Sequence, residues 1–249
     1  MLPVSVVIVT RNEERNIREA LQSIRDVAEI IIVDAFSTDR TADICREYTD
    51  KIYQKEWQGY AKQKQTGIEL ANSEWVFILD SDERFTEFLW KEISDITNHN
   101  RGYTGYYVPR KNFFLGKWIR HGGWWPDYTL RLFLKDKAVM EERKVHEKVV
   151  VNGKVGYLKN HLEHYTYRTV SDYLKKMDIY STLSAEELKS KGVSSGVLKM
   201  IIHPLFTFSK MFFLGLGFMD GIHGLVLAVL YGYYTFLKYL KLWEASSHN

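Results

Sequence analysis

The chain has 249 residues, of which 45% are hydrophobic and 26% are charged, and its formal net charge is +3. This length and composition exclude a disordered tail and allow one large domain, or a domain with an appendage, to bury a full core. The single cysteine, Cys45, excludes an internal disulfide and a zinc site built from several cysteines, and it fits a reducing compartment.

Charge is divided unevenly along the chain. Residues 1–100 hold 12 Lys and Arg against 19 Asp and Glu, residues 101–175 hold 15 against 7, and residues 176–249 hold 7 against 5. The basic middle block has the charge to meet a phosphorylated or diphosphate ligand. Its basic residues are spread among strand-like segments, and it contains no recognition helix and no nucleic-acid-binding motif. No nucleic acid partner is therefore expected.

The first hundred residues alternate apolar runs of strand length with helical spacing. The predicted strands span residues 4–10, 29–36, 51–57 and 74–80. A helix follows each of the first three strands, and the second helix is expected to be capped by Ser37 or Thr38. Such alternation predicts an α/β fold with a mostly parallel sheet covered by helices. No basic region precedes the first strand, so a buried strand is favoured over a signal peptide. We therefore expect a cytoplasmic location.

Polar residues lie at the carboxyl ends of these predicted strands. In a parallel sheet, ligands bind beyond the carboxyl ends, so we expect these residues to be neighbours in space. They are Thr10, Arg11 and Glu13 after the first strand, Asp34 at the second, and Asp80, Ser81 and Asp82 at the fourth.

The acidic segment that begins at Asp80 predicts a metal site. No glycine-rich turn follows the first strand and no GxxxxGK[ST] loop occurs, so the phosphates of a ligand need another partner. Asp80 and Asp82 would point to the same side of an extended segment, and carboxylates bind Mg²⁺ or Mn²⁺, which bridges phosphate oxygens. The alternative is a polar turn that caps the next helix, because acids are common at helix starts.

Three segments carry a resemblance to a known family: VSVVIVTRNEE, IIIVDAFSTDRTADI and KQKQTGIELANSEWVFILDSDE, all within residues 4–84. In this order and spacing they resemble the inverting family-two glycosyltransferases with the GT-A fold. The resemblance implies a UDP-sugar donor, with Mg²⁺ or Mn²⁺ held by Asp82 and Asp80. The nucleotide-sugar-binding residues are then Thr10, Arg11, Glu13, Asp34, Lys64, Asp80 and Ser81. The sequence departs from the commoner pattern at Ala35 and Phe36, where Asp and Gly are usual, and at Gln65, where Asn is usual.

The middle block is expected to bind the acceptor through GGWWPDYTLRLF, residues 122–133. Tryptophan rings stack on the C–H faces of sugars, so Trp124 and Trp125, with Asp127, are the predicted acceptor-binding residues. For one of the two tryptophans a core position is the alternative. Arg131 is predicted to neutralise the departing diphosphate.

Inversion requires one base that takes the proton of the acceptor hydroxyl. The candidates are Glu147, Asp127, Glu141 and Glu142. Glu147 is favoured because VHE, together with RLF and GGWWPD, resembles a branch of the family that glycosylates lipopolysaccharide core; a solvated, salt-bridging Glu is the alternative. His164 could complete the metal shell or be an ordinary satisfied histidine. Downstream of Glu147, Asn152 and Gly153 predict a hairpin turn between two short strands.

The last block is the most apolar part of the chain. Thr169 and Asp172 predict a capped helix that ends at Gly192. Between Asp220 and Lys238 lie 17 residues without a charged side chain, at the lower limit of the roughly 17–25 that a membrane-spanning helix needs. We expect helices that lie at the membrane surface. The alternatives are a true span, the subunit interface of a homo-oligomer, or a buried packing helix.

These inferences divide the chain into a nucleotide-sugar-binding half of a GT-A domain (residues 1–100), an acceptor-binding and catalytic half (101–175) and a C-terminal helical membrane-surface region (176–249). The predicted function is metal-dependent transfer of a hexose, with glucose favoured, from a UDP-sugar to a lipid-linked saccharide such as lipopolysaccharide inner core, at the cytoplasmic face of the inner membrane. The alternatives are a metal-dependent nucleotidyltransferase, which would release pyrophosphate, and a membrane-associated binding module without catalysis.

Overall fold

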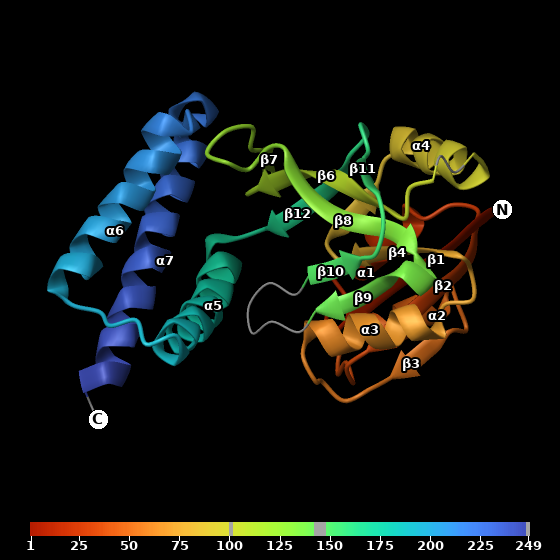
Figure 1. Ribbon diagram of the computed structural model, residues 1–249, viewed down its shortest axis with the longest axis horizontal. Coiled ribbons are helices and arrows are strands. Elements are labelled where there is room, and N and C mark those ends of the chain that lie inside the picture. The colour runs from red at the N-terminus through yellow and green to blue at the C-terminus, as the bar shows by residue number, and fades with distance from the viewer. Residues whose placement is uncertain (100–101, 142–147, 248–249) are drawn as a thin grey trace. The chain divides into compact units, whose positions relative to one another are not determined.

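The computed structural model describes residues 1–99, 102–141 and 148–247 (Figure 1). The chain forms two compact units: Met1–Arg110 with Tyr128–His164, and Lys111–Asp127 with Tyr165–Asn249. These bounds differ from the three blocks predicted from the sequence. The functional roles given to those blocks stay predictions.

The first strands form the parallel part of a mixed sheet whose strand order is β3-β2-β1-β4-β8-β6-β12-β5. β1 pairs in parallel with β2 and β4, and β2 pairs in parallel with β3, as the alternation of strands and helices predicts. β8 (Asp127–Leu134) then pairs antiparallel with β4. The bounds of the parallel strands are Leu2–Thr10 for β1, Val27–Asp34 for β2, Ile52–Gln54 for β3 and Trp75–Asp80 for β4.

The remaining strands extend the sheet or form a small second one. β12 pairs antiparallel with β5, β6 pairs with β7 and β11, and β9 pairs with β10 in a separate two-stranded sheet. Their bounds are Glu83–Phe85 for β5, Gly105–Phe114 for β6, Lys117–Trp118 for β7, Ala138–Glu141 for β9, Lys148–Val151 for β10, Val155–Tyr157 for β11 and Leu162–Tyr167 for β12. A 3₁₀ turn, η1 (Lys135–Lys137), precedes β9.

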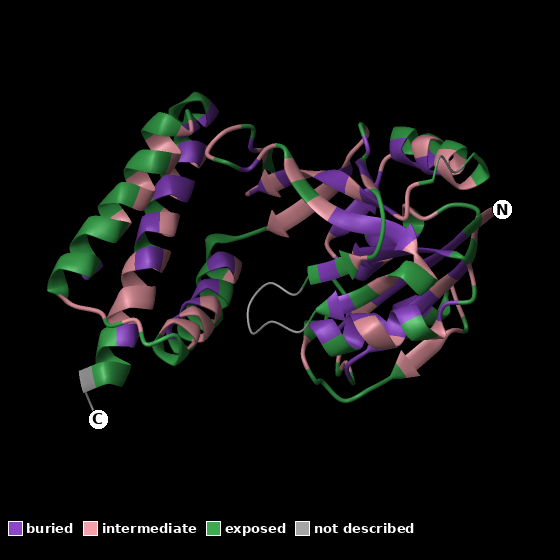
Figure 2. Ribbon diagram, in the orientation of Figure 1, coloured by how far each residue is buried: buried purple, intermediate pink, exposed green. Residues whose placement is uncertain are grey.

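Helices cover both faces of the parallel strands, and buried residues concentrate in the strands between them (Figure 2). Alternate residues of β1 belong to different core clusters: Val6 and Ile8 pack with α1, α2 and α4, whereas Val7 packs with α3. The contact with α3 is close, because a Cβ on Gly67 would lie 2.2 Å from a methyl group of Val7. The helix bounds are Ile17–Gln22 for α1, Thr41–Arg46 for α2, Tyr60–Leu70 for α3 and Glu87–Asn98 for α4.

The second unit is mainly helical. α5 and α6 each pack against α7. The predicted cap of α5 is confirmed, because the backbone N–H of Asp172 donates to Thr169 Oγ1 at 3.1 Å. The bounds are Val170–Ser190 for α5, Val197–Ser209 for α6, Lys210–Leu214 for the π-helical turn η2, Gly217–Asp220 for the 3₁₀ turn η3 and Ile222–Ser247 for α7.

Two local predictions are wrong. The strands on either side of Asn152 and Gly153 do not pair with each other: β10 pairs with β9, and β11 pairs in parallel with β6. Packing decides this, because Val149 of β10 joins the core cluster that contains Met140 of β9. The second error concerns α2, which begins after Arg40 without a side-chain cap, so Ser37 and Thr38 do not cap it.

Candidate functional site

The carboxyl ends of β1, β2 and β4 meet at one edge of the sheet in the first unit. In the strand registers Thr10 lies opposite Asp34, and Val9 lies opposite both Val33 and Asp80. The structure therefore brings together the three strand ends where the sequence predicts nucleotide-sugar binding. Parallel sheets place their ligands beyond this edge.

The Asp34 side chain is fully buried and fixed by the turn that follows it. Its carboxylate accepts hydrogen bonds from the backbone N–H of Ser37 at 3.0 Å, from Ser37 Oγ at 2.5 Å and from Gln54 Nε2 at 3.4 Å. Ser37 Oγ in turn accepts from the backbone N–H of Asn12 at 2.9 Å, which ties the turn after β2 to the turn after β1. The serine predicted to cap a helix instead orients Asp34.

The three residues predicted at the end of β1 differ in their burial and in their side-chain hydrogen bonds. Thr10 is buried, and its Oγ1 has no hydrogen-bond partner among the residues that the structure describes. Glu13 accepts from Asn16 Nδ2 at 2.9 Å, while Arg11 is exposed. Thr10 therefore offers an unused hydroxyl at this edge of the sheet, the kind of group that a polar ligand can satisfy.

Phe36, just after Asp34, has an unusual backbone conformation. Its φ is +52°, in the left-handed region that glycine adopts without steric cost, and its side chain is 53% exposed. Glycine, which the family resemblance implies at this position, would adopt this backbone without steric cost. In this chain a large apolar ring occupies the position and faces solvent.

The cations nearest the acidic turn are side chains of the protein itself. Lys64 Nζ lies 3.1 Å from Asp80 Oδ1, and Arg131 Nη2 contacts both Asp80 Oδ2 and Glu83 Oε1. Arg110 Nη1 lies 3.4 Å from the same oxygen of Glu83, which is fully buried. The crowding of carboxylates is thus offset by Arg131, Lys64 and Arg110, so crowding alone does not require a metal ion.

This network keeps Asp80 ionised. Burial alone would raise the pKa of Asp80, but the charges of Arg131 and Lys64 outweigh that effect and hold the pKa well below its usual range. Arg131 has the reciprocal environment: burial would lower its pKa, but Asp80 and Glu83 raise it. Its guanidinium is engaged by two carboxylates, and its predicted contact with a departing diphosphate stays a prediction.

Arg84 fixes the shape of the turn between β4 and β5. One of its amino groups donates to the carbonyl oxygens of Ser81 and Glu83, both at 2.8 Å, and the other donates to the carbonyl of Asn16 at 2.9 Å. The backbone N–H of Asp80 also donates to Glu83 Oε2 at 3.0 Å. The turn that presents Asp80, Ser81 and Asp82 is consequently held from within and from the segment before α1.

Asp82 lies beside His164. Asp82 Oδ1 and His164 Nε2 are 3.5 Å apart, and His164 lies opposite Glu83 in the pairing of β12 with β5. Among residues 1–99, 102–141 and 148–247, no cluster of three or more His, Cys, Asp or Glu could hold a metal ion. A magnesium site needs no such cluster when one or two carboxylates combine with substrate phosphates. Asp82 supplies one such carboxylate, and Asp80 lies two residues before it.

The predicted acceptor-binding residues lie in the second unit. Trp124 is only 7% exposed and belongs to a core cluster with Phe114, so little of its ring is available to a sugar. Trp125 is half-buried against Trp118, with ring centroids 5.5 Å apart. Asp127 accepts a hydrogen bond from Asn112 Nδ2 at 3.0 Å. The three acceptor-binding roles stay predictions, and the burial of Trp124 favours the core alternative for that residue.

Of the four candidate bases, the structure describes Asp127 and Glu141. Glu147 and Glu142 lie outside the described residues. Glu141 is exposed at the end of β9, opposite Lys148 of β10. Asp127 is oriented by Asn112. Glu147 therefore stays the predicted base on the strength of its sequence segment.

Sequence reasoning did not select Glu83, Arg84, Arg110 or Asn112. Glu83 forms part of a three-residue strand in which every residue is buried, and Arg110 and Arg131 are its partners. One signal was present: an acid and an arginine, Glu83-Arg84, directly precede the apolar Phe85. The pairing of Glu83 with basic residues 27 and 48 positions away needed the tertiary structure.

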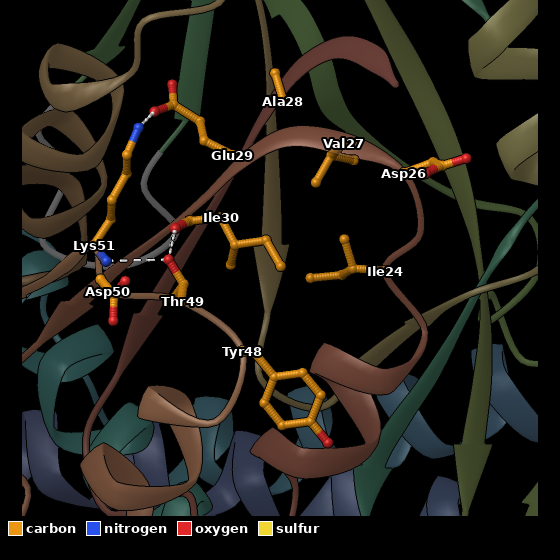
Figure 3. A pocket seen from close by; sticks show the side chains of 10 residues that line it. All are labelled: Ile24, Asp26, Val27, Ala28, Glu29, Ile30, Tyr48, Thr49, Asp50 and Lys51. Carbon is orange, nitrogen blue, oxygen red and sulfur yellow. Dashed lines mark hydrogen bonds and ion pairs between the residues drawn. The ribbon is translucent and has the colours of Figure 1, made fainter.

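A pocket of about 390 Å³ lies at the opposite ends of the strands (Figure 3). Its lining includes Glu29 near the start of β2 and Lys51 just before β3, which form an ion pair. Glu29 also accepts from Ser5 Oγ and from the backbone of Asn72. These contacts secure the amino ends of the strands, away from the edge where the predicted site residues meet.

Comparison with known proteins agrees with this geometry. The profile of glycosyl transferase family 2 matches residues 5–166. A lipopolysaccharide core biosynthesis glycosyltransferase, LpsC of Rhizobium meliloti, is 29% identical over 98% of this chain and 93% of its own length. An uncharacterized glycosyltransferase of Rickettsia typhi is 28% identical over 99% of this chain and 88% of its own length.

Among solved structures, that of Staphylococcus aureus TarS residues 1–349 in complex with UDP-GlcNAc aligns with a TM-score of 0.51 and 15% identity, over 98% of this chain and 91% of that chain. Mannosyl-3-phosphoglycerate synthase from Rubrobacter xylanophilus aligns with a TM-score of 0.50 and 13% identity, over 77% of this chain and 75% of that chain. At this identity the alignments show a shared fold, and the predicted GT-A architecture is confirmed. The chain belongs to glycosyl transferase family 2.

Proposed function

We propose that the protein transfers a hexose, with glucose favoured, from a UDP-sugar to a lipid-linked saccharide of the lipopolysaccharide inner core, with inversion at the anomeric carbon. The observation that carries the proposal is the fixed turn Asp80-Ser81-Asp82 at the sheet edge where the ends of β1 and β2 also meet. Support for the acceptor class comes from the name of the LpsC relative. Support for the donor class comes from the family and from the UDP-GlcNAc complex of TarS.

The strand ends supply groups suited to a nucleotide. The buried Asp34 carboxylate is oriented by Ser37 and can accept hydrogen bonds from a ribose or a base. Thr10 Oγ1 has no partner among the described residues and can bond to the same ligand. Lys64 and Arg131, which flank Asp80, supply positive charge toward a diphosphate.

Asp82 and Asp80 are the residues that would hold Mg²⁺ or Mn²⁺, and His164, 3.5 Å from Asp82, could complete the shell. When bound, such an ion supplies a Lewis acid that stabilises negative charge on the leaving diphosphate. Asp80 is kept ionised by Arg131 and Lys64 and can orient the ribose or take part in the metal shell, as the family resemblance implies. Arg84 keeps the turn in place, so the positions of Asp80 and Asp82 do not have to be organised at the moment of reaction.

Glu147 is the proposed base, which would remove the proton from the acceptor hydroxyl as that oxygen attacks the anomeric carbon. The bond from the anomeric carbon to the diphosphate then breaks, and UDP leaves with its electron pair. This assignment comes from the VHE segment and its resemblance to the lipopolysaccharide branch.

We also propose that the helices of the second unit bind the surface of a membrane. Two segments are long and apolar enough to cross one by length and composition: Val197–Leu214, which has a mean hydropathy of 1.4 and is not buried, and Ile222–Ser246, which is 28% buried. An interfacial position is favoured over a span because the C-terminal half of α7 makes polar contacts with α5. Tyr234 bonds Ser184 of α5, and Lys241 lies 2.6 Å from Asp178 of the same helix.

Vesicle flotation tests the membrane proposal. Phe206, on the apolar face of α6, is 59% exposed, and Phe206→Glu should reduce binding to vesicles because it places a charge among the acyl chains. Phe88 on α4 of the first unit is 69% exposed, so Phe88→Glu is the matched control and should bind like the unmodified protein. Equal binding of all three proteins would contradict the assignment of α6 as the membrane-facing helix.

Product analysis tests the catalytic proposal. The protein is incubated with UDP-glucose and lipopolysaccharide inner-core acceptors, and released UDP and glycosylated acceptor are measured. Asp82→Ala and Glu147→Gln should each abolish transfer, while only Asp82→Ala should weaken metal-dependent nucleotide binding. Pyrophosphate release from a nucleoside triphosphate without UDP release would establish a nucleotidyltransferase instead. If neither activity is detected, a binding module without catalysis is the remaining alternative.

A further inference from the structure

Phe36 follows the buried Asp34 in a backbone conformation that disfavours its residue type. Its φ is +52°, and a bulky residue with a positive φ is an outlier because its Cβ crowds the backbone. Its side chain is 53% exposed, so burial in the core does not offset this strain. The turn after β1 differs, because asparagine tolerates a positive φ, and Asn12 Oδ1 accepts from the backbone N–H of Thr38 at 2.8 Å. Retained strain is typical of ligand-binding sites, so Phe36 is a candidate ligand contact.

A second exposed aromatic ring follows β3, beside the same strand end. The backbone N–H of Lys55 donates to the carbonyl oxygen of Asp34 at 3.0 Å, so the chain leaves β3 next to Asp34. Trp57 comes two residues after Lys55 and is 39% exposed. Phe36 likewise comes two residues after Asp34. Two residues of extended chain span at most about 7 Å, so both rings are carried by backbone close to this hydrogen bond.

The segment that carries Trp57 is fixed by α3. Gln63 is 2% exposed, and its Nε2 donates at 2.7 Å to the backbone carbonyl just before Trp57. The Trp57 ring packs edge-on against Tyr60, with ring centroids 4.6 Å apart. Lys64 Nζ lies 5.8 Å from the centroid of the Tyr60 ring and 3.1 Å from Asp80 Oδ1. Side-chain contacts therefore run from Trp57 to the lysine that is proposed to supply positive charge toward a diphosphate.

The same strand end has an unused hydrogen-bonding group. Thr10 lies opposite Asp34 in the pairing of β1 with β2, and its buried hydroxyl has no partner among the residues that the structure describes. Buried hydroxyls normally have a partner, so this one marks a place where a ligand can add a polar group. A ligand with an aromatic ring and polar groups would use both the rings and the hydroxyl.

We propose that the rings of Phe36 and Trp57, which we call the base-stacking pair, bind the base of the donor nucleotide. Nucleobases are flat aromatic rings that stack on aromatic side chains. The base is favoured over the donor sugar, because in a nucleotide-sugar the diphosphate separates the two. The pair lies beside Asp34, whereas Lys64 contacts Asp80. The inference rests on the proposed function and deepens it, because it assigns recognition of the base to stacking by this chain's own side chains.

Two nucleotides that differ in one double bond of the base test the base-stacking pair. The ring of 5,6-dihydrouracil keeps the N–H and carbonyl groups of uracil but is puckered and not aromatic. The full chain, in a neutral detergent and with Mn²⁺, is titrated calorimetrically with UDP and with 5,6-dihydro-UDP. UDP should bind about tenfold more tightly, as expected for base–aromatic stacking. Phe36→Ala and Trp57→Ala should each remove most of that difference, whereas Phe36→Tyr and Trp57→Phe should keep it.

Phe36→Gly separates a binding role from a structural one. It should weaken UDP binding as Phe36→Ala does, while the free energy of unfolding rises, because glycine adopts a positive φ without steric cost. A loss of stability with unchanged UDP affinity would assign the ring to packing and overturn the proposal.

Phe88 provides the matched control, because it is 69% exposed on α4 of the same unit. Phe88→Ala should retain the full preference for UDP over 5,6-dihydro-UDP. Equal affinities for the two nucleotides in the unmodified protein, or an equal loss in Phe88→Ala and Phe36→Ala, would overturn the proposal.

Two further ligands separate the base-stacking pair from the rest of the donor site. Pyrophosphate carries no base, so its binding with Mn²⁺ should be the same in the unmodified protein and in Phe36→Ala. A loss in Phe36→Ala that is seen with UDP-glucose but not with UDP would place the ring against the donor sugar and overturn the assignment to the base. Failure of the proposed metal site would appear instead as a UDP affinity that does not depend on Mn²⁺, with the preference for UDP over 5,6-dihydro-UDP intact.

Discussion

The two units stabilise buried charge in different ways. In the first unit, Asp80 and Glu83 face the side chains of Lys64, Arg110 and Arg131, so charge is balanced by charge. In the second unit, Asp220 is held mainly by backbone N–H groups of the loop after β7. The first arrangement keeps a site ionised and rigid, and the second fixes the path of a loop. Mutations should therefore have different costs in the two units.

Removal of Arg131 should have the largest effect on stability. Its side chain is 4% exposed and contacts Asp80 and Glu83, so Arg131→Leu leaves a fully buried Glu83 whose other ion-pair partner among the described residues is Arg110. Breaking a buried pair from one side costs about 3–5 kcal/mol. Urea unfolding should show a loss of this size. Arg18→Leu, which breaks the exposed pair with Glu47, is the control and should have little effect; equal losses would refute the buried network.

Acid should reveal a second stabilising network, at the amino ends of the strands. Burial raises the pKa of Glu29, but hydrogen bonds from Lys51, Ser5 and Asn72 lower it to about 2 from the usual 4.5. The stabilisation is therefore complete above pH 4.5 and is lost as the pH falls from 4.5 toward 2. A shift of this size corresponds to about 3 kcal/mol.

Urea unfolding across that pH range measures the effect. Glu29→Gln should be less stable than the unmodified protein at pH 7, and the difference should shrink as the pH falls toward 2. A difference that stays constant between pH 7 and pH 3 would contradict the lowered pKa of Glu29.

The loss of Asp220 should cost less than the loss of Arg131. Asp220→Ala removes the acceptor of two backbone N–H groups, and unsatisfied donors of this kind cost about 1–3 kcal/mol. Asp178→Ala is the control, since that carboxylate is 73% exposed beside Lys241. If Asp220→Ala proved as stable as the control, the loop would not depend on this carboxylate.

The smallest expected effect is at Phe36. A left-handed backbone costs a non-glycine residue about 1–2 kcal/mol, while glycine carries its own entropic cost of about 0.5–1 kcal/mol. Phe36→Gly should therefore raise the free energy of unfolding by up to about 1 kcal/mol, because the exposed ring is not packed in the core. A loss of stability in thermal or urea unfolding would show that the ring makes a stabilising contact.

More of the structure of the first unit than of the second could be predicted from the sequence. The apolar runs of β1, β2 and β4 have the length of buried strands, and the parallel arrangement then places Thr10, Asp34 and Asp80 at one edge. The partners of Asp80 could not be predicted, because Lys64 and Arg131 come from distant segments. The periodicity of β10 likewise does not predict its partner strand. That partner is β9, which lies outside the predicted hairpin.

In the second unit the sequence indicates helices and apolar surface but not their contacts. The Trp124-Trp125 pair is an example: adjacent residues in the sequence, one in the core and the other against Trp118. The role of Asp220 depends on contacts with residues about 100 positions earlier in the chain. Local patterns carry no information over that separation.

We propose that the turn after β4 binds the diphosphate of a nucleotide-sugar through a metal ion on Asp82. Calorimetric titration of UDP, with and without Mn²⁺, tests it most directly in the unmodified protein and in Asp82→Ala. Mn²⁺ should strengthen UDP binding to the unmodified protein and should have no such effect on Asp82→Ala. Identical UDP affinities in the two proteins, with Mn²⁺ present, would contradict it.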